Sequence, residues 1–353
     1  MTFELTTLRD LSSAAFDTII DVRAPSEFAL DHVPGAMNLP VLSDAERAEV
    51  GTLYKQVDKF EARKRGAALV ARNAADHIDG TLRQRPGGWR PLIYCWRGGQ
   101  RSESFAAILS RIGWRVEVLS GGYRSYRRRV AAVVHDQPIA PQVIVLDGNT
   151  GTAKTAFLQR LRARGHQTLD LEAAAGHRGS VFGHLPERQP SQKAFEGRLA
   201  MQLSAMDADR PVVVEAESSK IGNVQIPPSL WTAMILAPRI RLNVPLSARA
   251  GYLVEAYGDV TADPVALNAT LDALRPHQGA ARIEAWQAMV ATGAFGALAA
   301  ELMEAHYDPR YAKSRMRRST GRVVDVHVAV LDDEGLAHGA EQIEAALRSL
   351  SAV

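Results

Sequence analysis

The stretch that decides the fold of this chain is Leu146-Asp147-Gly148-Asn149-Thr150-Gly151-Thr152-Ala153-Lys154-Thr155. A β-branched run, residues 143–145, enters it and a helical pattern leaves it, which predicts a strand, a glycine-containing turn and a helix. Such a turn directs successive backbone N–H groups toward one point, and the helix N-terminus adds partial positive charge. The lysine supplies a cation, and the final threonine supplies a hydroxyl suited to phosphate-bound Mg²⁺. The stretch therefore predicts a binding site for a di- or triphosphate.

The same stretch follows the Walker A pattern except at Ala153, where a glycine normally precedes the lysine. Because alanine tolerates helical backbone angles, we expect the turn to keep its fold, although the methyl group is expected to crowd the phosphates. The alternative is an ordinary strand, turn and helix with an incidental lysine. The predicted diphosphate-binding residues are Gly148, Asn149, Thr150, Gly151, Lys154 and Thr155.

Length and composition limit the class of protein. The chain has 353 residues, which suggests about two domains. No apolar run approaches the ~18 residues of a membrane span, and the first residues lack the pattern of a secretory signal. The single cysteine excludes an intrachain disulfide and favours a reducing compartment, so we expect a cytoplasmic protein without membrane association. The formal charge is only +3, but the arginines cluster locally.

Strands and helices alternate in both halves of the chain, which predicts an α/β protein with two parallel sheets. We expect a first domain over residues 1–134, a linker over 135–141 and a P-loop domain over 142–353. Within the second domain, residues 246–319 are expected to form a helical insertion that contacts RNA. The closing segment is expected to add a strand over 322–331 and a helix over 340–350.

The lone cysteine, Cys95, follows an apolar strand and precedes a predicted helix. Several N–H groups and the helix dipole are expected to meet at the sulfur there, with positive charge from Arg97 and Arg101. These features favour a thiolate beneath an anion site, which is a nucleophile for sulfur, selenium or phosphorus transfer. We therefore predict Cys95, Arg97 and Arg101 as catalytic residues. A buried, inert cysteine is the alternative.

This first half resembles the rhodanese family. The resemblance rests on Asp21-Val-Arg23, Glu27-Phe28, His32-Val-Pro-Gly35-Ala, Asn38-Leu-Pro40 and the loop at Cys95. It implies a rhodanese-like sheet and a chalcogen carried on the cysteine. The Cys-x5-Arg spacing is one residue longer than in the common rhodanese loop and also resembles dual-specificity phosphatases. Because the sequence places no general acid, chalcogen transfer is the preferred interpretation.

Polar residues of the second half supply further candidates. Glu215 and Glu217 follow an apolar strand, where P-loop proteins place the acid that orients Mg²⁺ or water. A glycine-containing loop carries His177, Arg178 and Ser180, and Arg249 opens the helical region. Local hydrogen bonding by a strand-end carboxylate and a solvated arginine are the ordinary alternatives. No metal site is predicted with certainty, although Mg²⁺ is a candidate.

Two basic runs are candidate RNA contacts because arginine and lysine neutralise phosphates and tyrosine stacks on bases. The first run lies before the linker and the second ends the helical region. Either run could instead be a solvated helix face. The predicted RNA-contacting residues are Arg127, Arg128, Arg310, Tyr311, Lys313, Arg315, Arg317 and Arg318.

The chain as a whole resembles the tRNA 2-selenouridine synthase family. The resemblance rests on the stretches 94–102, 148–151, 177–183, 189–196, 215–222 and 307–311. It implies conversion of wobble 2-thiouridine to 2-selenouridine in tRNA, with selenophosphate and geranyl diphosphate as substrates and an S-geranyl intermediate. It also implies a selenophosphate-producing enzyme as a partner and no tightly bound cofactor. Two alternatives remain: a thiosulfate sulfurtransferase fused to a P-loop small-molecule kinase, and a binding protein whose two loops are relics.

Overall fold

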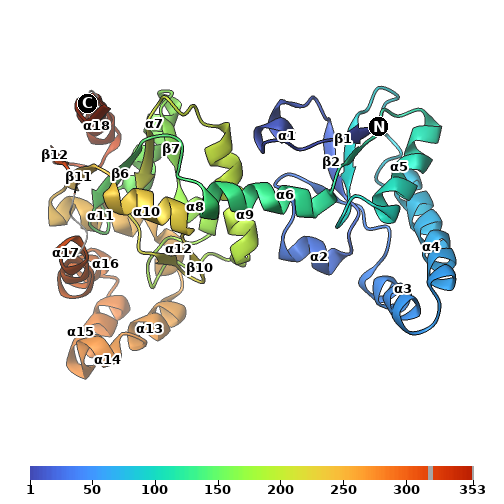
Figure 1. Cartoon of the computed structure of the whole chain (residues 1–353). Helices are drawn as coiled ribbons and strands as arrows, with labels where there is room; N and C mark the ends of the chain where they lie inside the picture. The colour runs from blue at the N-terminus through green and yellow to red at the C-terminus, as the bar shows by residue number, and fades with distance from the viewer. Residues whose placement is uncertain (317–320, 352–353) are drawn as a thin grey trace. The chain divides into compact units, whose positions relative to one another are not determined.

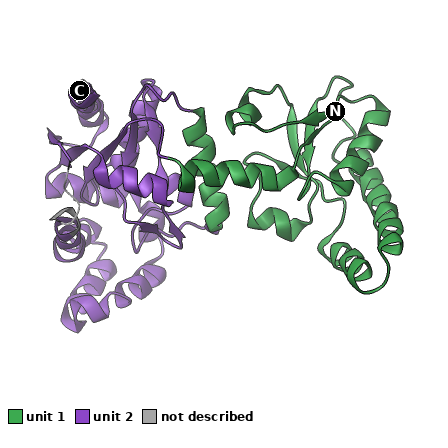
Figure 2. Cartoon of the chain, viewed as in Figure 1, with its two compact units in different colours: residues 1–137, 190–205 green, residues 138–189, 206–353 purple. Residues whose placement is uncertain are grey.

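The chain folds into two compact units (Figure 1). The computed structural model describes residues 1–316 and 321–351, and describes residues 314–316 by their backbone only. The first unit contains residues 1–137 and 190–205, and the second contains residues 138–189 and 206–353 (Figure 2). Each unit is built around its own sheet, as the alternation of strands and helices predicted.

The first unit has a sheet of five parallel strands in the order β1-β5-β4-β2-β3. The strands are β1 Thr2–Phe3, β2 Thr18–Asp21, β3 Met37–Asn38, β4 Pro91–Tyr94 and β5 Glu117–Leu119. The helices are α1 Arg9–Ser13, α2 Pro25–Leu30, α3 Asp44–Gln56, α4 Lys59–Asp79, α5 Gln100–Ile112, α6 Gly122–Ala131, the π-helix η1 Ala132–Asp136, and α9 Gln192–Ala205. Strand β4 is buried along its whole length, which explains its continuous apolar sequence.

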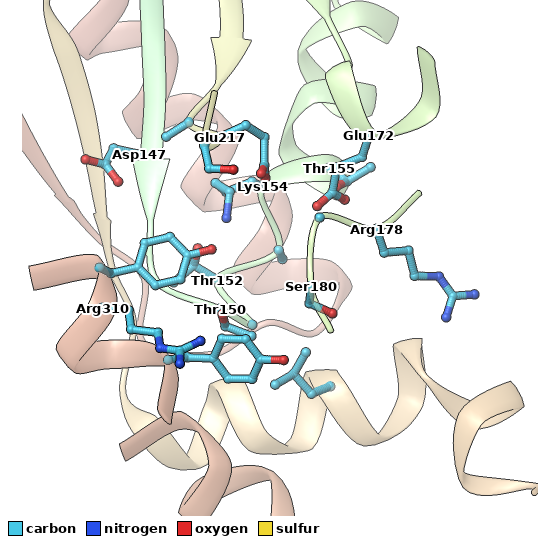
Figure 3. A pocket seen from close by; sticks show the side chains of 18 of the residues that line it. Asp147, Thr150, Thr152, Lys154, Thr155, Glu172, Arg178, Ser180, Glu217 and Arg310 are labelled. Atoms are coloured by element: carbon cyan, nitrogen blue, oxygen red, sulfur yellow. The ribbon is translucent and has the colours of Figure 1, made fainter. Parts of the chain in front are cut away.

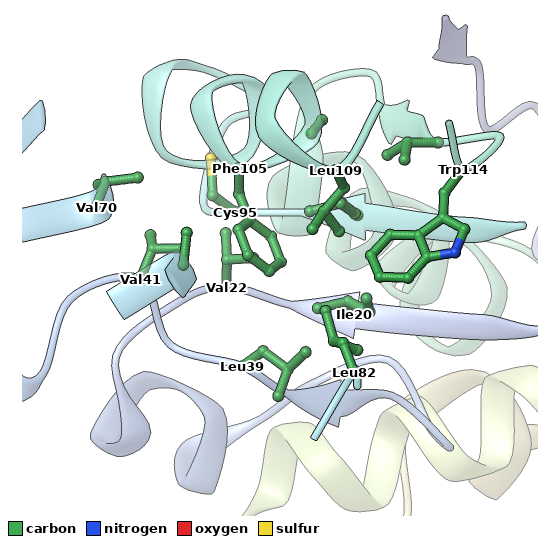
Figure 4. Close-up of a cluster of buried hydrophobic side chains, with 14 of the residues drawn as sticks. Ile20, Val22, Leu39, Val41, Val70, Leu82, Cys95, Phe105, Leu109 and Trp114 are labelled. Atoms are coloured by element: carbon green, nitrogen blue, oxygen red, sulfur yellow. The ribbon is translucent and has the colours of Figure 1, made fainter. Parts of the chain in front are cut away.

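The core of the first unit lies between the sheet and helices α4 and α5 (Figure 4). Ile20 and Ile93 contribute from the sheet, and Val70, Phe105 and Leu109 contribute from the helices. Cys95 belongs to the same buried cluster. The core therefore fixes the position at which β4 ends and the cysteine loop begins.

Helix α9 is the point at which the units differ from the predicted domains. Residues 190–205 were expected in the second domain, but they pack in the first unit against α6 and η1. Gly197 allows this close approach, because a Cβ there would collide with the Tyr126 hydroxyl. Glu196 receives Arg127 and His135 as ionic partners beside it. The expected linker is also partly helical, because η1 continues α6 through residue 136.

The second unit has a parallel sheet in the order β12-β11-β6-β8-β7. Its strands are β6 Val143–Gly148, β7 Gln167–Leu169, β8 Val212–Glu215, β11 Arg239–Asn243 and β12 Val323–His327. The short pair β9 Lys220–Ile221 and β10 Val224–Gln225 is antiparallel. Helices α7 Lys154–Ala163, α8 Leu171–Ala175, α10 Pro228–Leu236 and α18 Asp333–Ser351 accompany the sheet. The final strand is shorter than expected and the final helix begins earlier.

Residues 246–316, which follow β11, are mainly helical, as the sequence predicted, and residues 317–319 of the expected insertion lie outside the described part of the chain. The helices are α11 Leu246–Ala256, α12 Gly258–Thr261, α13 Pro264–Asp272, α14 Arg275–Gln278, α15 Ala280–Ala291, α16 Phe295–Leu302, the π-helix η2 Met303–Tyr307, and α17 Asp308–Met316. They enclose a separate apolar cluster around Leu271, Ile283 and Trp286. Among the helices that the structure describes, none combines the length and the apolar character needed to cross a bilayer.

The close packing of α9 on α6 generates a prediction. Gly197→Ala should lower the free energy of unfolding by about 1–3 kcal/mol, because the added methyl group overlaps the Tyr126 hydroxyl in a packed core. Gly51→Ala in α3 is the matched control, since nothing lies within 4 Å of its added Cβ. Urea unfolding of both variants measures the difference. Equal stability of the Gly197 variant and the wild type would contradict the packing of α9 on this unit.

Candidate functional site

The cysteine loop begins where the central strand β4 ends and closes at the start of α5. The Cys95 Sγ accepts hydrogen bonds from the Gly99 N–H at 3.4 Å and the Ser102 hydroxyl at 3.2 Å. Gly122, with φ of 57°, lets the β5–α6 turn lie directly against this loop. A Cβ at Gly122 would collide with the Cys95 carbonyl oxygen, so only glycine permits this packing.

These donors control the protonation of the thiol. Burial opposes ionisation, since Cys95 is 4% exposed, yet the pKa of the thiol is lowered. The Ser102 hydroxyl and the N–H groups of Gly99, Ser102 and Arg97 stabilise the thiolate more than burial disfavours it. The lowered pKa favours the thiolate form of this buried sulfur, as a nucleophilic role would require.

The two predicted arginines have different positions from those expected. Arg101 donates to Glu27 at 3.0 Å, and Arg47 binds the same carboxylate oxygen at 3.0 Å. Arg97 is exposed. The leading donors to the sulfur are therefore a hydroxyl and backbone N–H groups, while the Arg101 guanidinium is engaged by a carboxylate.

The predicted P-loop connects β6 to α7 in the second unit. Lys154 Nζ donates to the Gly148 carbonyl at 3.3 Å, and the Thr152 hydroxyl donates to the Asn149 carbonyl at 2.9 Å. Ala153 differs from expectation, because its φ of 57° is left-handed rather than ordinary helical. Among the described residues it is the single non-glycine with positive φ. The turn keeps its shape at a backbone cost of about 1–2 kcal/mol for the alanine.

A cavity of about 730 Å³ opens over this loop (Figure 3). Residues 150–155 line one side, and Glu172, Glu217 and Arg310 are also in its wall. The carboxylates of Glu172 and Glu217 lie together, because a Cβ at Gly179 would meet both. Both carboxyl groups interact electrostatically with the Lys154 ammonium group. The cavity therefore combines backbone N–H groups, one ammonium group and a carboxyl pair.

The charges in the cavity alter one another. Burial opposes the charge on Lys154, but Tyr311, Glu217 and Glu172 together raise its pKa. Burial and the neighbouring Glu217 raise the pKa of Glu172 to about 8. The Lys154 ammonium group therefore keeps its proton to a higher pH than a free lysine, and the Glu172 carboxyl group keeps its proton to a higher pH than a free glutamic acid.

The two strand-end glutamates have distinct positions. Glu215 is fully buried, and one carboxylate oxygen accepts the Glu172 N–H at 2.9 Å at the start of α8. Glu217 lines the cavity. The structure thus gives Glu215 a local structural contact and leaves Glu217 as the carboxylate that can face a ligand.

A smaller apolar pocket of about 80 Å³ adjoins the cavity. The two spaces share the wall residues Thr150, Ser180, Leu253, Tyr257 and Tyr307. Beyond them, the small pocket is lined by Phe182, Val254, Val260, Thr261, Leu267, Phe295, Leu298, Ala299, Leu302 and Met303. An apolar space therefore lies next to the polar cavity over the P-loop.

The other predicted residues of this unit divide into two groups. Arg178 and Ser180 line the cavity, and Arg178 pairs with Asp259 at 2.9 Å. His177 is buried and accepts the Gly179 N–H. Arg249 is buried beside the P-loop, where it binds Asp308 at 2.8 Å and the Thr150 carbonyl at 3.3 Å. It supports the loop from outside the cavity wall rather than facing a phosphate.

The structure places the residues of the two basic runs in different surroundings. Arg127 pairs with Glu196, whereas Arg128 is exposed. Arg310 and Tyr311 line the cavity, with Lys154 Nζ 5.8 Å from the Tyr311 ring centroid. Lys313 is exposed. The Arg315 side chain and residues 317–318 lie outside the described part of the chain.

Glu172 and Tyr307 were not predicted as site residues, and Tyr311 was predicted as an RNA contact rather than as a cavity residue. Glu172 follows the end of β7 and therefore meets Glu217 at the same edge of the sheet. Tyr307 and Tyr311 are four residues apart across the η2–α17 junction, so one helical face presents both to the cavity. The strand-end position of Glu172 and the tyrosine spacing were the available signals.

The fold and the two loops define a class of protein: a rhodanese-like unit with a thiol nucleophile, joined to a P-loop unit. Family models agree, since residues 4–129 match the rhodanese-like domain and residues 141–275 match the tRNA 2-selenouridine synthase AAA domain.

Curated relatives extend the match across both units. A tRNA 2-selenouridine synthase of Chromohalobacter salexigens is 36% identical over 83% of this chain and 86% of its own length. Proteins of the same name from Nitrosomonas europaea and Aeromonas salmonicida are 36% and 37% identical over 68% and 70% of this chain. These two matches span 63% and 67% of the relatives' own lengths. The chain belongs to the tRNA 2-selenouridine synthase family.

The hydrogen bonds at the sulfur generate a prediction about its titration. The rate of Cys95 alkylation by iodoacetamide should reach half its maximum below the ordinary thiol pKa of about 8.5, because the loop donors lower the pKa. Ser102→Ala removes one donor and should move the midpoint to higher pH. Cys95 is the chain's single cysteine, so the labelled mass reports on it alone. Coincident pH profiles for the two proteins would contradict the role of Ser102.

Proposed function

We propose that this protein converts 2-thiouridine at the tRNA wobble position to 2-selenouridine in two half-reactions. The first alkylates the sulfur with geranyl diphosphate, and the second replaces the geranylated sulfur with selenium. The observation that carries the proposal is that the P-loop cavity shares wall residues with an adjacent apolar pocket. The names of the curated relatives support the overall conversion.

The first half-reaction uses the P-loop as a leaving-group site. The thiouridine sulfur attacks the allylic carbon of geranyl diphosphate, the carbon–oxygen bond breaks, and diphosphate leaves. Lys154 and the N–H groups of residues 150–155 would stabilise the charge that develops on the departing oxygens. Because no γ-phosphate must be oriented, a left-handed Ala153 in place of glycine is compatible with this role.

The hydrocarbon tail is the reason to prefer a prenyl diphosphate over a nucleotide. The adjoining pocket is almost wholly apolar, with leucine, valine and phenylalanine side chains in its wall. Burying a hydrocarbon gains about 0.8 kcal/mol per CH₂ group, so such a pocket favours an isoprenoid chain over a ribose. This property also separates the proposal from a small-molecule kinase.

The second half-reaction is assigned to the cysteine loop. Selenophosphate is the proposed donor, supplied by a selenophosphate-producing enzyme, and Cys95 is the proposed selenium-handling residue. The selenium of selenophosphate would bond to C2 of the base as the C2–S bond breaks and geranyl thiol leaves with a proton; water would then cleave the Se–P bond and release phosphate. The lowered pKa of the Cys95 thiol supports a nucleophile at neutral pH. Arg97, exposed in the same loop, is available to an incoming anion.

Magnesium is included in the proposal for the first half-reaction. Thr155 and Glu217 both line the cavity, and their oxygens are ligands that Mg²⁺ accepts alongside substrate phosphates. Within the described residues no three His, Cys, Asp or Glu side chains form a metal cluster, so phosphate oxygens and water would complete the shell. When bound, the ion would neutralise charge on the leaving diphosphate.

The proposed macromolecular substrate is tRNA carrying wobble 2-thiouridine. Exposed Arg128 and Lys313 are suited to phosphate contacts, and Arg310 at the cavity wall can meet either RNA or diphosphate. Arg127 is less available, because Glu196 already neutralises it.

The two half-reactions can be separated with single substitutions in the full chain. Lys154→Ala should reduce S-geranyl-2-thiouridine formation by roughly 10²-fold or more, because charge stabilisation of the leaving group is lost. Cys95→Ser should abolish 2-selenouridine while geranylation continues. Mass spectrometry of tRNA nucleosides, with selenophosphate and geranyl diphosphate added separately and together, measures both products. Lys220→Ala, an exposed lysine of the same unit, is the control. Unchanged product levels in either active-loop variant would refute the assignment of that loop.

The apolar pocket gives a separate prediction. Ala299→Phe fills the pocket from α16 and should raise the KM for geranyl diphosphate by about tenfold or more, since at least two CH₂ groups lose their burial. Ala297→Phe, at an exposed position on the same helix, should leave KM unchanged. Inhibition by inorganic pyrophosphate should be equal in all three proteins. An unchanged KM for geranyl diphosphate in Ala299→Phe would show that the geranyl chain does not bind in this pocket.

A further inference from the structure

Trp96 directly follows the nucleophile Cys95 and is the aromatic residue of the loop that the proposed chemistry has not yet used. The side chain is 37% exposed, although its neighbours Tyr94 and Cys95 are buried. A single exposed tryptophan needs no explanation on most surfaces. Here the exposed tryptophan is the residue that directly follows the cysteine in the same loop.

The indole of Trp96 packs in a cluster with the Tyr123 ring and the Arg23 guanidinium, each of which lies near both of the others. Its ring centroid lies 5.1 Å from that of Tyr123, with an interplanar angle of 30°. The guanidinium of Arg23 lies over the Tyr123 ring at 4.0 Å and 5.9 Å from the Trp96 ring. Arg23 and Tyr123 are buried. Two buried side chains therefore contact a Trp96 ring that remains partly open to solvent.

Arg23 and Tyr123 are each held in place by polar contacts of their own. Arg23 binds the Asp21 carboxylate at 2.6 Å and the Asp31 carbonyl at 2.6 Å. The Tyr123 hydroxyl donates to the Asp31 carboxylate at 2.7 Å. The Trp96 backbone is held as well, because its carbonyl accepts the Arg124 N–H at 3.2 Å. The platform is thus rigid before any ligand binds, which reduces the ordering cost of binding.

We propose that Trp96 is a nucleobase platform, on which the modified uracil ring stacks while it reacts at the cysteine loop. The inference rests on the proposed function and assigns the base-binding contact of its second half-reaction. The ligand class follows from shape and charge: an indole offers a flat π-surface to a base, and exposed Arg97 beside it can meet a phosphate. Trp96 is a positioning residue, since it binds the ring and takes no part in bond exchange.

The test compares substitutions that keep or remove the aromatic face. The substrate is an anticodon stem-loop RNA that carries S-geranyl-2-thiouridine, supplied with selenophosphate and the full-length protein. Trp96→Ala should raise the KM for this RNA about 5- to 150-fold, the range expected for one lost base–aromatic stack. The effect should fall on KM more than on kcat, because stacking stabilises the bound and reacting states alike. Trp96→Phe should retain most of the affinity, whereas Trp96→Leu should behave as Trp96→Ala.

Two controls separate a platform from a structural role. Phe60→Ala removes an exposed aromatic side chain from α4 in the same unit and should leave KM unchanged. The pH profile of Cys95 alkylation should be the same in wild type and Trp96→Ala, because the sulfur's donors come from Ser102, Gly99 and the loop backbone. A Trp96→Ala protein with an altered profile would have lost its loop geometry, and the platform would be rejected.

Binding is measured independently by fluorescence polarisation of the labelled 2-thiouridine stem-loop. Weaker binding by Trp96→Ala and Trp96→Leu, with Trp96→Phe near wild type, supports the platform. Equal binding and equal KM in all variants would overturn it. If the wild type binds the RNA but forms no 2-selenouridine, the proposed function fails. The relative RNA affinities of the variants then still show whether Trp96 binds the base.

Discussion

The structure depends on one constraint: backbone N–H groups must converge where a buried parallel strand turns into a helix. In the first unit this occurs after β4, where the N–H groups of the following loop surround the Cys95 sulfur. In the second unit it occurs after β6, where the loop carries Lys154. Both strands are buried, so both loops are held by a core and present fixed dipoles to an anion.

The two loops use that constraint differently because their charged neighbours differ. At Cys95 the leading donors are uncharged, and the nearby Arg101 is balanced by Glu27. The loop therefore lowers the pKa of a thiol without filling the space with fixed cations. Lys154 carries a positive charge whose pKa is raised, and the carboxyl groups of Glu172 and Glu217 make the surroundings of its ammonium group polar. The first arrangement suits a nucleophile and the second suits a departing anion.

Close backbone approach is the other recurring device. Gly122 lets the β5–α6 turn lie against the Cys95 carbonyl, and Gly197 lets α9 lie against Tyr126. Gly151, with φ of 82°, leaves room for the Arg249 carbonyl 3.0 Å from the position of a Cβ. Ala153 is the exception, since it holds a left-handed conformation with a side chain present. The surrounding loop and core therefore impose a conformation that local preference opposes.

The sequence by itself determined the two parallel sheets, the helical segment after β11, and the placement of Cys95 and Lys154 at strand ends. These features follow from hydrophobic periodicity and turn chemistry, which are local properties. Only the tertiary structure decided which carboxyl groups line the cavity. Glu172 and Glu217 lie together although they are 45 positions apart in the sequence. Glu215, in contrast, is buried in the core. Tertiary structure also decided that α9 packs outside the unit that its sequence position suggested. It likewise brought the side chains of Arg23, Tyr123 and Trp96 together. Such contacts depend on side-chain direction and on which strands become neighbours, and no local pattern encodes either.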